Sequence, residues 1–525
     1  MQPAAHFQYL SVTANDGQTA SLFTAVCLPE PSGVFPVVVY RSPYVDDAAA
    51  LPEEEVCSRL LASQRSWLQH GYAVVFQHCR GRGKSGGDCV PYVYEREDGL
   101  ALHEWIRRQP FYGGELYLCG TSYTASVHYV CAPFADDIRG AVFEVQDCER
   151  YNCNYRNGFF KMGLHGGWYA GMYKHKSLRN KAYTPEAFHT LPLSAFSRAV
   201  FGERAADLDA VFAHPSRSDP FWQTRFGGGE AHEAVRHAAF PILFVTGFYD
   251  IYTGGVFDMW NTLDAETRAR CALAVHPYDH GGSGKGQPIP FERGALGEAF
   301  GDYRTAWMDA VRGRGPFPFP QGCVTYYRLF GGGWRTDRFP EGERALRFPL
   351  GEGERSYRYN PYAPASFRGG LSANFGGAQW QDKPGQRQDI LSFFTPVFAS
   401  DTTVQGKMRA RLAVRSDCED TCFYVRVSLC KPEGDFGLRD DIQQISNVRP
   451  DYTPGETVEL DFSFDEHSFV IKAGERLRVD VSSSAFPLYV RHTNQRGLYS
   501  AQTTARIAAN TVLCAQSSLY VPVTS

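Results

Sequence analysis

Three polar residues follow apolar runs in the sequence. Their side chains, a hydroxyl, a carboxylate and an imidazole, are those that can cleave an acyl bond. Ser122 lies between an apolar run and a helical segment, Asp250 follows the run 241–246, and His280 follows the run 272–276. A serine hydroxyl is a poor nucleophile unless a histidine takes its proton and a carboxylate orients that histidine. The set therefore suits nucleophilic acyl transfer, although on local features alone these could equally be three unrelated loop residues.

The segment 115–131 predicts a short strand, one glycine and a helix that begins at once, with Ser122 at the bend. In α/β-hydrolases such a turn exposes a serine beside the backbone N–H groups at the helix start. The order serine, aspartate, histidine, each after a strand, is also the order of that fold. Thr124 stands where the usual G-x-S-x-G has its second glycine, so the motif is incomplete and an ordinary turn serine stays open.

Two neighbours compete for the same roles. His276 lies at the expected strand end, where a packed structural histidine is the usual case. Asp279 is adjacent to His280, and we expect it to be solvated or to support the site from outside. Asp250 and His280 remain the preferred pair.

Acyl transfer also needs donors for the developing oxyanion. The backbone N–H of Tyr123, directly after the serine, is one candidate. Tyr44, which follows the predicted strand 36–40, could supply a phenolic O–H as the second. The alternative for Tyr44 is a packing role in its loop.

The glycine-rich segment 79–87 resembles the end of a phosphate-binding loop, but His78 stands where that motif has its first glycine. We interpret it as a structural loop beside the site, braced by Arg80 and Arg82.

Strand and helix patterns alternate over the first part of the chain and return after residue 240. Buried-strand patterns cover 20–27, 36–40, 72–77, 241–246 and 272–276, and helical patterns cover 53–69 and 98–109. This alternation predicts an α/β fold with a parallel, doubly wound sheet.

Two further regions differ in character. Residues 148–238 are aromatic and form short helical pieces, which predicts a helical cap between core parts 1–147 and 239–344. After residue 345 the pattern alternates, with predicted strands at 408–415, 423–429, 457–462 and 477–481. Short strands at this spacing predict a β-sandwich over 345–525.

Composition excludes several classes of partner. A net charge of −4 over 525 residues leaves no basic surface for nucleic acid. The N-terminal residues do not resemble a signal peptide, and no run suits a membrane span, so we expect a cytoplasmic protein without a membrane partner. The 14 cysteines then indicate reduced thiols. Cys418 with Cys422 and Cys148 with Cys153 lack a second pair at zinc-site spacing, so we expect no metal and no cofactor.

Taken with their order, the motifs of this chain resemble the cocaine-esterase and X-Pro dipeptidyl-peptidase family of serine hydrolases, which includes α-amino-acid ester hydrolases and glutaryl-cephalosporin acylases. The resemblance extends to about residue 500. The matching motifs are Arg41-Ser-Pro-Tyr44, Cys79-Arg-Gly-Arg-Gly, Glu97-Asp-Gly, Glu104-Trp-Ile-x-x-Gln-Pro110, Gly120-x-Ser-Tyr123, Gly247-x-Tyr-Asp250, His-Pro-Tyr-Asp-His280, Gly-Gly-Trp-Arg335, Asp389-Ile-Leu-Ser-Phe and Ser-Ser-Ala-Phe-Pro487.

The resemblance implies an α/β-hydrolase core, an inserted helical cap and a C-terminal jelly roll. It implies that Ser122 is the nucleophile, His280 the general base and Asp250 its orienting partner. Tyr44 and the Tyr123 amide would be the oxyanion donors. Trp168 and Tyr252 fall where relatives place acyl-pocket aromatics.

The chain departs from the family pattern at three places. His78 replaces an aspartate, Ala125 replaces the glycine of Gly-x-Ser-Tyr-x-Gly, and the segment 434–454 lacks a Leu-x-x-Gly-x-x-Arg stretch. The first two put loop packing in question. The third predicts a different surface facing the cap.

The expected function is hydrolysis of a carboxylic ester with a bulky or aromatic acyl group, through an acyl-enzyme. An α-amino-acyl ester, β-lactam side-chain or X-Pro peptide hydrolase is the second hypothesis. It would need cap carboxylates for a free amino group, for which Asp147, Glu149 and Asp219 are candidates. A noncatalytic carbohydrate- or protein-binding protein is the alternative of another class. The expected partner is a small ester or short peptide, and a homo-oligomer is compatible with the sequence.

Overall fold

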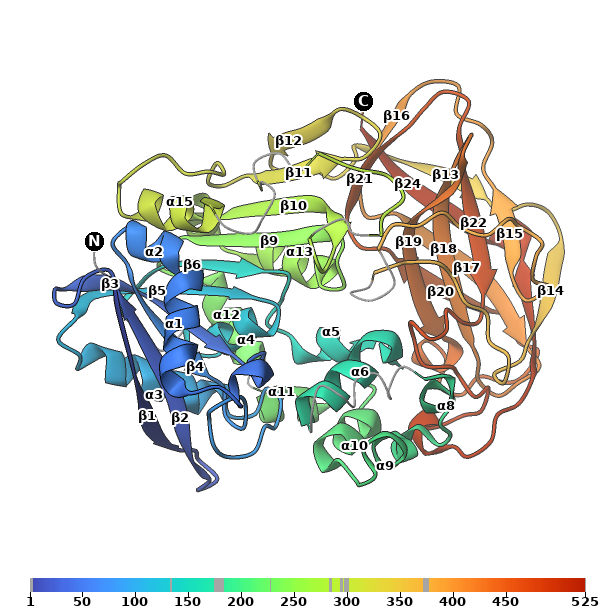
Figure 1. Cartoon of the computed structure of the whole chain (residues 1–525). Coiled ribbons are helices and arrows are strands. Elements are labelled where there is room, and N and C mark those ends of the chain that lie inside the picture. Colours follow the sequence, from blue (N-terminus) through green and yellow to red (C-terminus); the bar gives the residue numbers. More distant parts are fainter. Residues whose placement is uncertain are drawn as a thin grey trace.

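The computed structural model describes residues 3–132, 135–173, 184–226, 228–282, 286–292, 296, 302–371 and 377–524. A ten-stranded sheet forms the first part of the molecule (Figure 1). Its strands, in spatial order, are β1 (Ala4–Thr13), β2 (Thr19–Leu28), β4 (Ala73–His78), β3 (Phe35–Ser42), β5 (Tyr112–Thr121), β6 (Ile138–Glu144), β9 (Ile242–Tyr249), β10 (Ala272–Asp279), β11 (Val324–Arg328) and β12 (Gly333–Asp337).

The strands from β4 to β11 pair in parallel, and the outer pairs β1–β2, β2–β4 and β11–β12 are antiparallel. This is the predicted α/β fold. The prediction omitted the edge strands and also β6, whose short apolar run follows a polar turn. The helices of this part are α1 (Glu53–Ser63), α2 (Arg65–Gln69), α3 (Glu95–Arg107), α4 (Tyr123–Tyr129), α12 (Gly228–Arg236), α13 (Thr253–Thr262), α14 (Ala265–Arg270) and α15 (Asp302–Val311). The predicted helix 53–69 is two helices, which meet at Gln64.

Alternate residues of the parallel strands face two separate apolar layers. Val37 and Val39 pack into the cluster that holds Leu102 of α3, and Val38 packs into the cluster that holds Trp307 of α15. Side chains of a strand alternate between faces, so a continuous apolar run needs helices on both sides. The sheet is therefore buried between helical layers, and its strand ends are left for the site.

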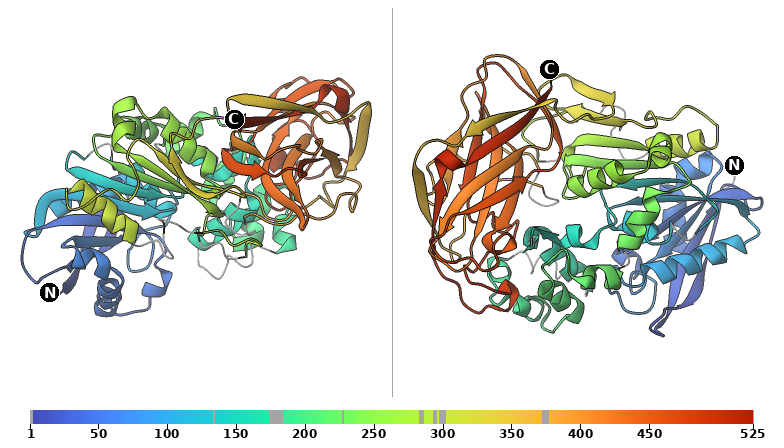
Figure 2. Two further views of the ribbon diagram at one scale, coloured as in Figure 1. Left: turned by 90° about the horizontal axis from the view of Figure 1, so that it is seen from above. Right: turned by 180° about the vertical axis from the view of Figure 1, so that it is seen from behind.

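Residues 148–238, here called the cap segment, are mainly helical. The views in Figure 1 and Figure 2 agree that this segment runs from the sheet toward the C-terminal β domain. Its elements are α5 (Arg150–Asn154), β7 (Tyr155–Arg156), β8 (Phe159–Phe160), α6 (Met162–Tyr173), α8 (Pro185–Phe188), α9 (Phe196–Phe201), α10 (Ala206–Ala213) and α11 (Pro220–Phe226), followed by α12.

The C-terminal β domain contains two antiparallel sheets. One consists of β14 (Glu354–Tyr359), β23 (Ala508–Leu513), β17 (Arg409–Ser416), β24 (Ser518–Thr524), β16 (Thr402–Gly406) and β21 (His467–Ile471), with β13 (Arg344–Pro349) and β20 (Val458–Ser463) attached. The other consists of β15 (Leu391–Phe394), β22 (Arg476–Ser482), β18 (Cys422–Lys431) and β19 (Gly434–Gln444). The four sandwich strands expected from the sequence correspond to β17, β18, β20 and β22. The domain boundaries at 147, 238 and 344 stay a prediction.

Backbone hydrogen bonds join the β domain to the main sheet. The Leu329 N–H donates to the Ser468 carbonyl at 3.0 Å, and the Val470 N–H donates to the Leu329 carbonyl at 2.9 Å. Within the described ranges, no helix is both long and apolar enough to cross a membrane.

Candidate active site

Ser122 lies on a sharp turn between β5 and α4. Its backbone has φ 58° and ψ −131°, a conformation that non-glycine residues rarely adopt. The Ser122 N–H donates to the Glu144 carbonyl of β6 at 2.9 Å, and the Ser122 carbonyl accepts the Ala125 N–H at 2.9 Å. The sheet and the helix together hold Ser122 in this strained conformation. The sharp turn exposes its side chain at the strand ends.

Gly120 and Thr124 close this turn. A Cβ at Gly120 would lie 2.1 Å from the Thr124 carbonyl oxygen, so only glycine fits there. The Thr124 hydroxyl accepts the Thr121 N–H at 2.7 Å and donates to the Thr121 carbonyl at 2.7 Å. Thr124 therefore braces the turn at the position where the usual motif has glycine. Ala125, which replaces the glycine of relatives, is fully buried against the core.

Asp250, His280 and Ser122 form one hydrogen-bonded chain. His280 Nδ1 lies 2.6 Å from Asp250 Oδ2, and His280 Nε2 lies 2.9 Å from Ser122 Oγ. Asp250 is fully buried, and its Oδ1 also accepts the Tyr252 N–H at 2.6 Å. A carboxylate on one ring nitrogen and a hydroxyl on the other is the arrangement that activates a serine.

The charge around His280 favours its protonated form. Burial alone lowers its pKa, but the charge and hydrogen bond of Asp250 and the charge of Asp279 outweigh burial and raise the pKa above 6.5. Burial raises the pKa of Asp279 itself to about 6, and the neighbouring Asp250 adds to this rise. An imidazolium formed by taking the serine proton is thus stabilised in place.

Helix α13 begins at Thr253, three residues after Asp250, and two carboxylates approach its first turn. A Cβ at Gly254 would lie 2.5 Å from Asp465 Oδ1, and one at Gly255 would lie 1.7 Å from Asp147 Oδ2. The two glycines therefore let acidic side chains approach the positive end of the helix. Burial raises the pKa of Asp147 to about 6. These contacts tie the start of α13 to Asp147, the residue before the cap segment, and to the β domain.

The two expected oxyanion donors lie on adjoining elements. Tyr123 is the first residue of α4, where backbone N–H groups have no partner within the helix. The Tyr44 and Tyr123 rings are 6.4 Å apart, and the Tyr44 hydroxyl accepts the indole N–H of Trp168 at 3.1 Å. The described geometry thus brings Tyr44 and Trp168, which are far apart in the sequence, beside the serine turn.

Arg82 holds the Tyr44 loop against the cap segment. Its Nε donates to the Pro43 carbonyl at 2.9 Å, and Nη1 donates to the Met172 carbonyl at 2.9 Å. Arg80 forms an ion pair with Asp98 at 2.6 Å. The glycine-rich loop is therefore structural, as the sequence indicated. In the same loop, the Lys84 N–H donates to Nδ1 of His78, whose pKa burial lowers to about 4.

Aromatic rings surround the triad. The Tyr252 ring lies 5.5 Å from the His280 ring. Trp168 stacks on Tyr92 at 5.4 Å, and Tyr92 lies 4.5 Å from the Tyr123 ring. Trp168 and Tyr252 therefore both lie where they could contact an acyl group, whereas Tyr92 was not anticipated from the sequence.

The hydrogen-bonded chain contains Asp250 and His280 and neither of the two competing residues. His276 is buried inside β10, and a Cβ on Gly247 would lie 2.3 Å from its ring. Asp279 accepts the Gly281 N–H at 3.2 Å, and its charge acts on His280, whose Nδ1 contacts Asp250 instead. Both act as packing or supporting groups.

Two buried carboxylates near the turn were missed by the sequence reasoning. Glu95 Oε1 accepts the Tyr123 hydroxyl at 2.7 Å and Oε2 pairs with Arg41 at 3.0 Å. Glu144, at the end of β6, accepts the Thr121 hydroxyl and pairs with Arg304. A charged residue at the end of a buried strand is a signal that could have indicated Glu144. It was missed because β6 was not predicted.

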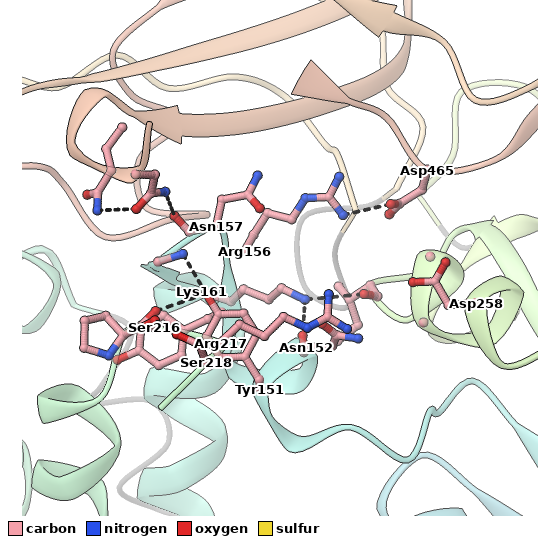
Figure 3. Close-up of a pocket in the computed structure, with 18 residues that line it drawn as sticks. Tyr151, Asn152, Arg156, Asn157, Lys161, Ser216, Arg217, Ser218, Asp258 and Asp465 are labelled. Carbon is pink, nitrogen blue, oxygen red and sulfur yellow. Dashed lines mark hydrogen bonds and ion pairs between the residues drawn. The ribbon is translucent and has the colours of Figure 1, made fainter. Parts of the chain in front are cut away.

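A polar pocket of about 430 Å³ lies behind the Asp250 loop, where the cap segment, α13 and the β domain meet (Figure 3). Arg156 extends across it and pairs with Asp465 at 2.8 Å and with Asp441 at 2.8 Å. The Lys161 ammonium donates to the Asn152 carbonyl at 2.5 Å. Asp441 belongs to the altered segment 434–454, which does face the cap segment.

The proposed amine-binding carboxylates do not gather at Ser122. Glu149 accepts two hydrogen bonds from Arg217, at 3.0 and 2.5 Å. Asp219 lies 2.7 Å from Nδ1 of His214. Asp147 faces the start of α13. In the part of the chain that the structure describes, no group of three or more His, Cys, Asp or Glu is arranged to hold a metal ion.

The fold is that of an α/β-hydrolase. Its parallel sheet carries a serine on the β5–α4 turn, an aspartate after β9 and a histidine after β10. A sequence model of the X-Pro dipeptidyl-peptidase (S15 family) matches residues 16–282, and one of the X-Pro dipeptidyl-peptidase C-terminal non-catalytic domain matches residues 319–518. The chain belongs to this hydrolase family.

Relatives cover nearly the whole chain. A cocaine esterase of Rhodococcus sp. (strain MB1 Bresler) is 25% identical over 532 residues, covering 90% of this chain and 89% of the relative. An aminopeptidase structure from a Thaumarchaeota archaeon has a TM-score of 0.81 at 18% identity and covers 99% of this chain and 96% of its own. An α-amino acid ester hydrolase structure has a TM-score of 0.79 at 17% identity with the same coverage. The structural likenesses show the shared fold.

Proposed function

We propose that the protein is a serine hydrolase that cleaves carboxylic esters through an acyl-enzyme. The observation that carries this is the chain from Asp250 through His280 to Ser122, with contacts of 2.6 and 2.9 Å. Ser122 Oγ attacks the ester carbonyl while His280 Nε2 takes its proton. The same proton then goes to the departing alcohol or phenol as the C–O bond breaks.

The second half repeats this chemistry with water. His280 takes a proton from a water molecule, the hydroxide adds to the acyl-serine, and the carboxylic acid leaves as Ser122 regains its proton. In both halves the negative oxygen is bound by the Tyr123 N–H and the Tyr44 O–H. Asp250 keeps His280 in the tautomer that presents Nε2 to the serine. Trp168 and Tyr252 contact the acyl group.

A hydrolase of α-amino-acyl esters or X-Pro peptides is the second candidate, favoured by the family model and by the aminopeptidase and α-amino acid ester hydrolase folds. Two contacts support the ester hypothesis instead. Glu149 pairs with Arg217 and Asp219 with His214, so these carboxylates already have partners other than a substrate amino group.

One comparison separates the candidates. The kcat/KM values of a 4-nitrophenyl benzoate, an α-amino-acyl 4-nitrophenyl ester and an Ala-Pro 4-nitroanilide are measured with the same protein. We expect the benzoate to be cleaved best. A preference for the Ala-Pro anilide would replace the esterase proposal, and no turnover of any of the three would contradict both.

A further inference from the structure

A buried carboxylate joins the first turn of α15 to the ends of two central strands. Glu144, at the end of β6, is fully buried. Its Oε1 accepts the Tyr303 hydroxyl and the Nε–H of Arg304, the latter at 2.7 Å. Its Oε2 accepts the Thr121 hydroxyl and an Nη2–H of Arg304. Each oxygen of this carboxylate therefore accepts two hydrogen bonds, and one guanidinium holds both oxygens.

The same guanidinium also contacts the last residue of β5. Nη2 of Arg304 donates to the Thr121 hydroxyl oxygen at 3.0 Å, so Arg304 contacts β5 and β6 at once. Thr121 directly precedes Ser122, and its backbone N–H and carbonyl bind the Thr124 hydroxyl across the turn. The Glu144 carbonyl accepts the Ser122 N–H at 2.9 Å. Both partners of Arg304 are therefore part of the serine turn or hydrogen-bonded to it.

Stability alone is a weak reason for such an ion pair. Taking two charges out of water costs about as much as their attraction returns, and apolar residues of the same volume often stabilise a core equally well. Ser122, in contrast, has φ 58°, and a strained conformation persists only where its surroundings fix it from several sides. A planar guanidinium that binds a carboxylate with two parallel hydrogen bonds fixes both the distance and the angle between the groups. The pair is therefore suited to hold the two strand ends that carry the serine.

We propose that Arg304 is a positioning residue for Ser122. It acts through Glu144 and Thr121 and contacts neither the substrate nor the reacting atoms. The inference rests on the proposed esterase function, in which Ser122 is the nucleophile. Without the guanidinium the two strand ends can shift, and Ser122 Oγ then leaves the position in which His280 Nε2 takes its proton.

The loss of positioning should appear in kcat rather than in KM. A displacement of about 1 Å is enough to cost about 10²-fold in rate. Acylation and deacylation both depend on the position of Ser122, so both steps should slow together. The contacts of Arg304 lie on the strand ends and not on the acyl-binding rings, so KM should change little.

The test measures kcat and KM for 4-nitrophenyl benzoate and the rate of fluorophosphonate labelling at Ser122, well below the Tm of each variant. Arg304→Met should lower kcat and the labelling rate about 10–100-fold, with KM within about twofold of wild type. Arg304→Lys keeps a cation for Glu144 but loses the paired geometry, so its kcat should lie between the two. Arg312→Met is the matched control, because Arg312 follows the same helix, is 16% exposed against 17% for Arg304, and pairs with Glu115 of β5 at 3.3 Å. It should leave kcat and the labelling rate unchanged.

A double variant separates positioning from stability. Arg304→Met alone leaves the Glu144 carboxylate buried without its cation and should lower Tm. Adding Glu144→Gln removes that charge, so Tm should recover, while kcat should stay low because the guanidinium that joins the strand ends is still absent. If Arg304→Met does not fold, this double variant and Arg304→Lys decide.

Two results would overturn the inference. One is an Arg304→Met enzyme with the kcat and labelling rate of the wild type. The other is a double variant whose kcat returns to the wild-type value together with its Tm, which is the result expected of a purely structural ion pair. No turnover by the wild type would instead contradict the esterase function, and the labelling rates at Ser122 would then test the inference by themselves.

Discussion

The indole N–H of Trp168 donates to the phenolic oxygen of Tyr44 at 3.1 Å, linking a cap-segment helix to the loop after β3. A phenol that accepts a hydrogen bond becomes a stronger donor, because bonds in a chain polarise one another. In the proposed mechanism, Trp168 therefore both orients Tyr44 and strengthens its O–H toward the oxyanion.

Tyr44→Phe should lower kcat by about 10²–10³-fold with little change in KM, since one oxyanion donor is lost. Trp168→Phe keeps an aromatic ring and should cost only about 2–10-fold, the worth of one neutral hydrogen bond. The measurement is steady-state hydrolysis of a 4-nitrophenyl ester. Tyr362→Phe, at an exposed tyrosine of the β domain, is the control. A Tyr44→Phe enzyme within threefold of wild type would remove Tyr44 from the oxyanion site.

The pH dependence of kcat/KM should report His280. In the proposed mechanism the neutral imidazole is the active form. Its pKa is raised because Asp250 and Asp279 outweigh burial, so activity should fall on acidification below an apparent pKa above 6.5. Asp279→Asn removes one charge that stabilises the imidazolium, so the acid limb should move to lower pH.

Asp279 carries its charge only above its own pKa of about 6. The difference in kcat/KM between Asp279→Asn and the wild type should therefore be seen above about pH 6. Asp264→Asn, at a surface aspartate that pairs with His237, should leave the profile unchanged. A limb that is identical in Asp279→Asn and wild type would show that Asp279 does not act on His280.

Gly120→Ala should destabilise the serine turn. The new Cβ would lie 2.1 Å from a backbone oxygen, and backbone cannot give way as a flexible side chain does. We expect a loss of about 3 kcal/mol in the free energy of unfolding and loss of ester hydrolysis. Gly315→Ala is the control, because a Cβ at Gly315 would meet no atom within 4 Å. It should change neither the stability nor the ester hydrolysis. Equal melting temperatures for the two variants would contradict the described turn.

Glu466 of the β domain should make stability depend on pH. Burial raises its pKa to about 8, and its Oε2 has no hydrogen-bond partner among the described residues. The folded state keeps a proton that the unfolded chain, with a pKa near 4.5, has lost, so stability falls as pH rises from about 4.5 to 8.

Glu466→Gln removes this ionisation and should raise Tm at pH 9 more than at pH 5. The exposed Glu459→Gln serves as the control, and thermal unfolding at the two pH values is the readout. A larger gain at pH 5 than at pH 9 would contradict the sign of this prediction.

The sequence predicted the parallel sheet because β3, β4, β9 and β10 are continuous apolar runs, as buried parallel strands require, and because they alternate with helical segments. It pointed to Ser122, Asp250 and His280 because each follows such a run, and these three lie together in the structure while their roles stay predictions. It missed Glu144 because the apolar run within β6 is short, so this strand was not recognised. Tyr92 lies in a turn, where no periodicity indicates which side chains meet.

The central claim is that Ser122 becomes covalently acylated. The most direct measurement is mass spectrometry of the intact protein and its peptides after treatment with a fluorophosphonate, in the wild type and in Ser122→Ala. The account predicts one adduct, on the peptide that contains Ser122, together with loss of ester hydrolysis. It predicts no adduct and no hydrolysis in Ser122→Ala, with an unchanged Tm. An adduct on another residue, or a Ser122→Ala protein that still hydrolyses esters at the wild-type rate, would contradict it.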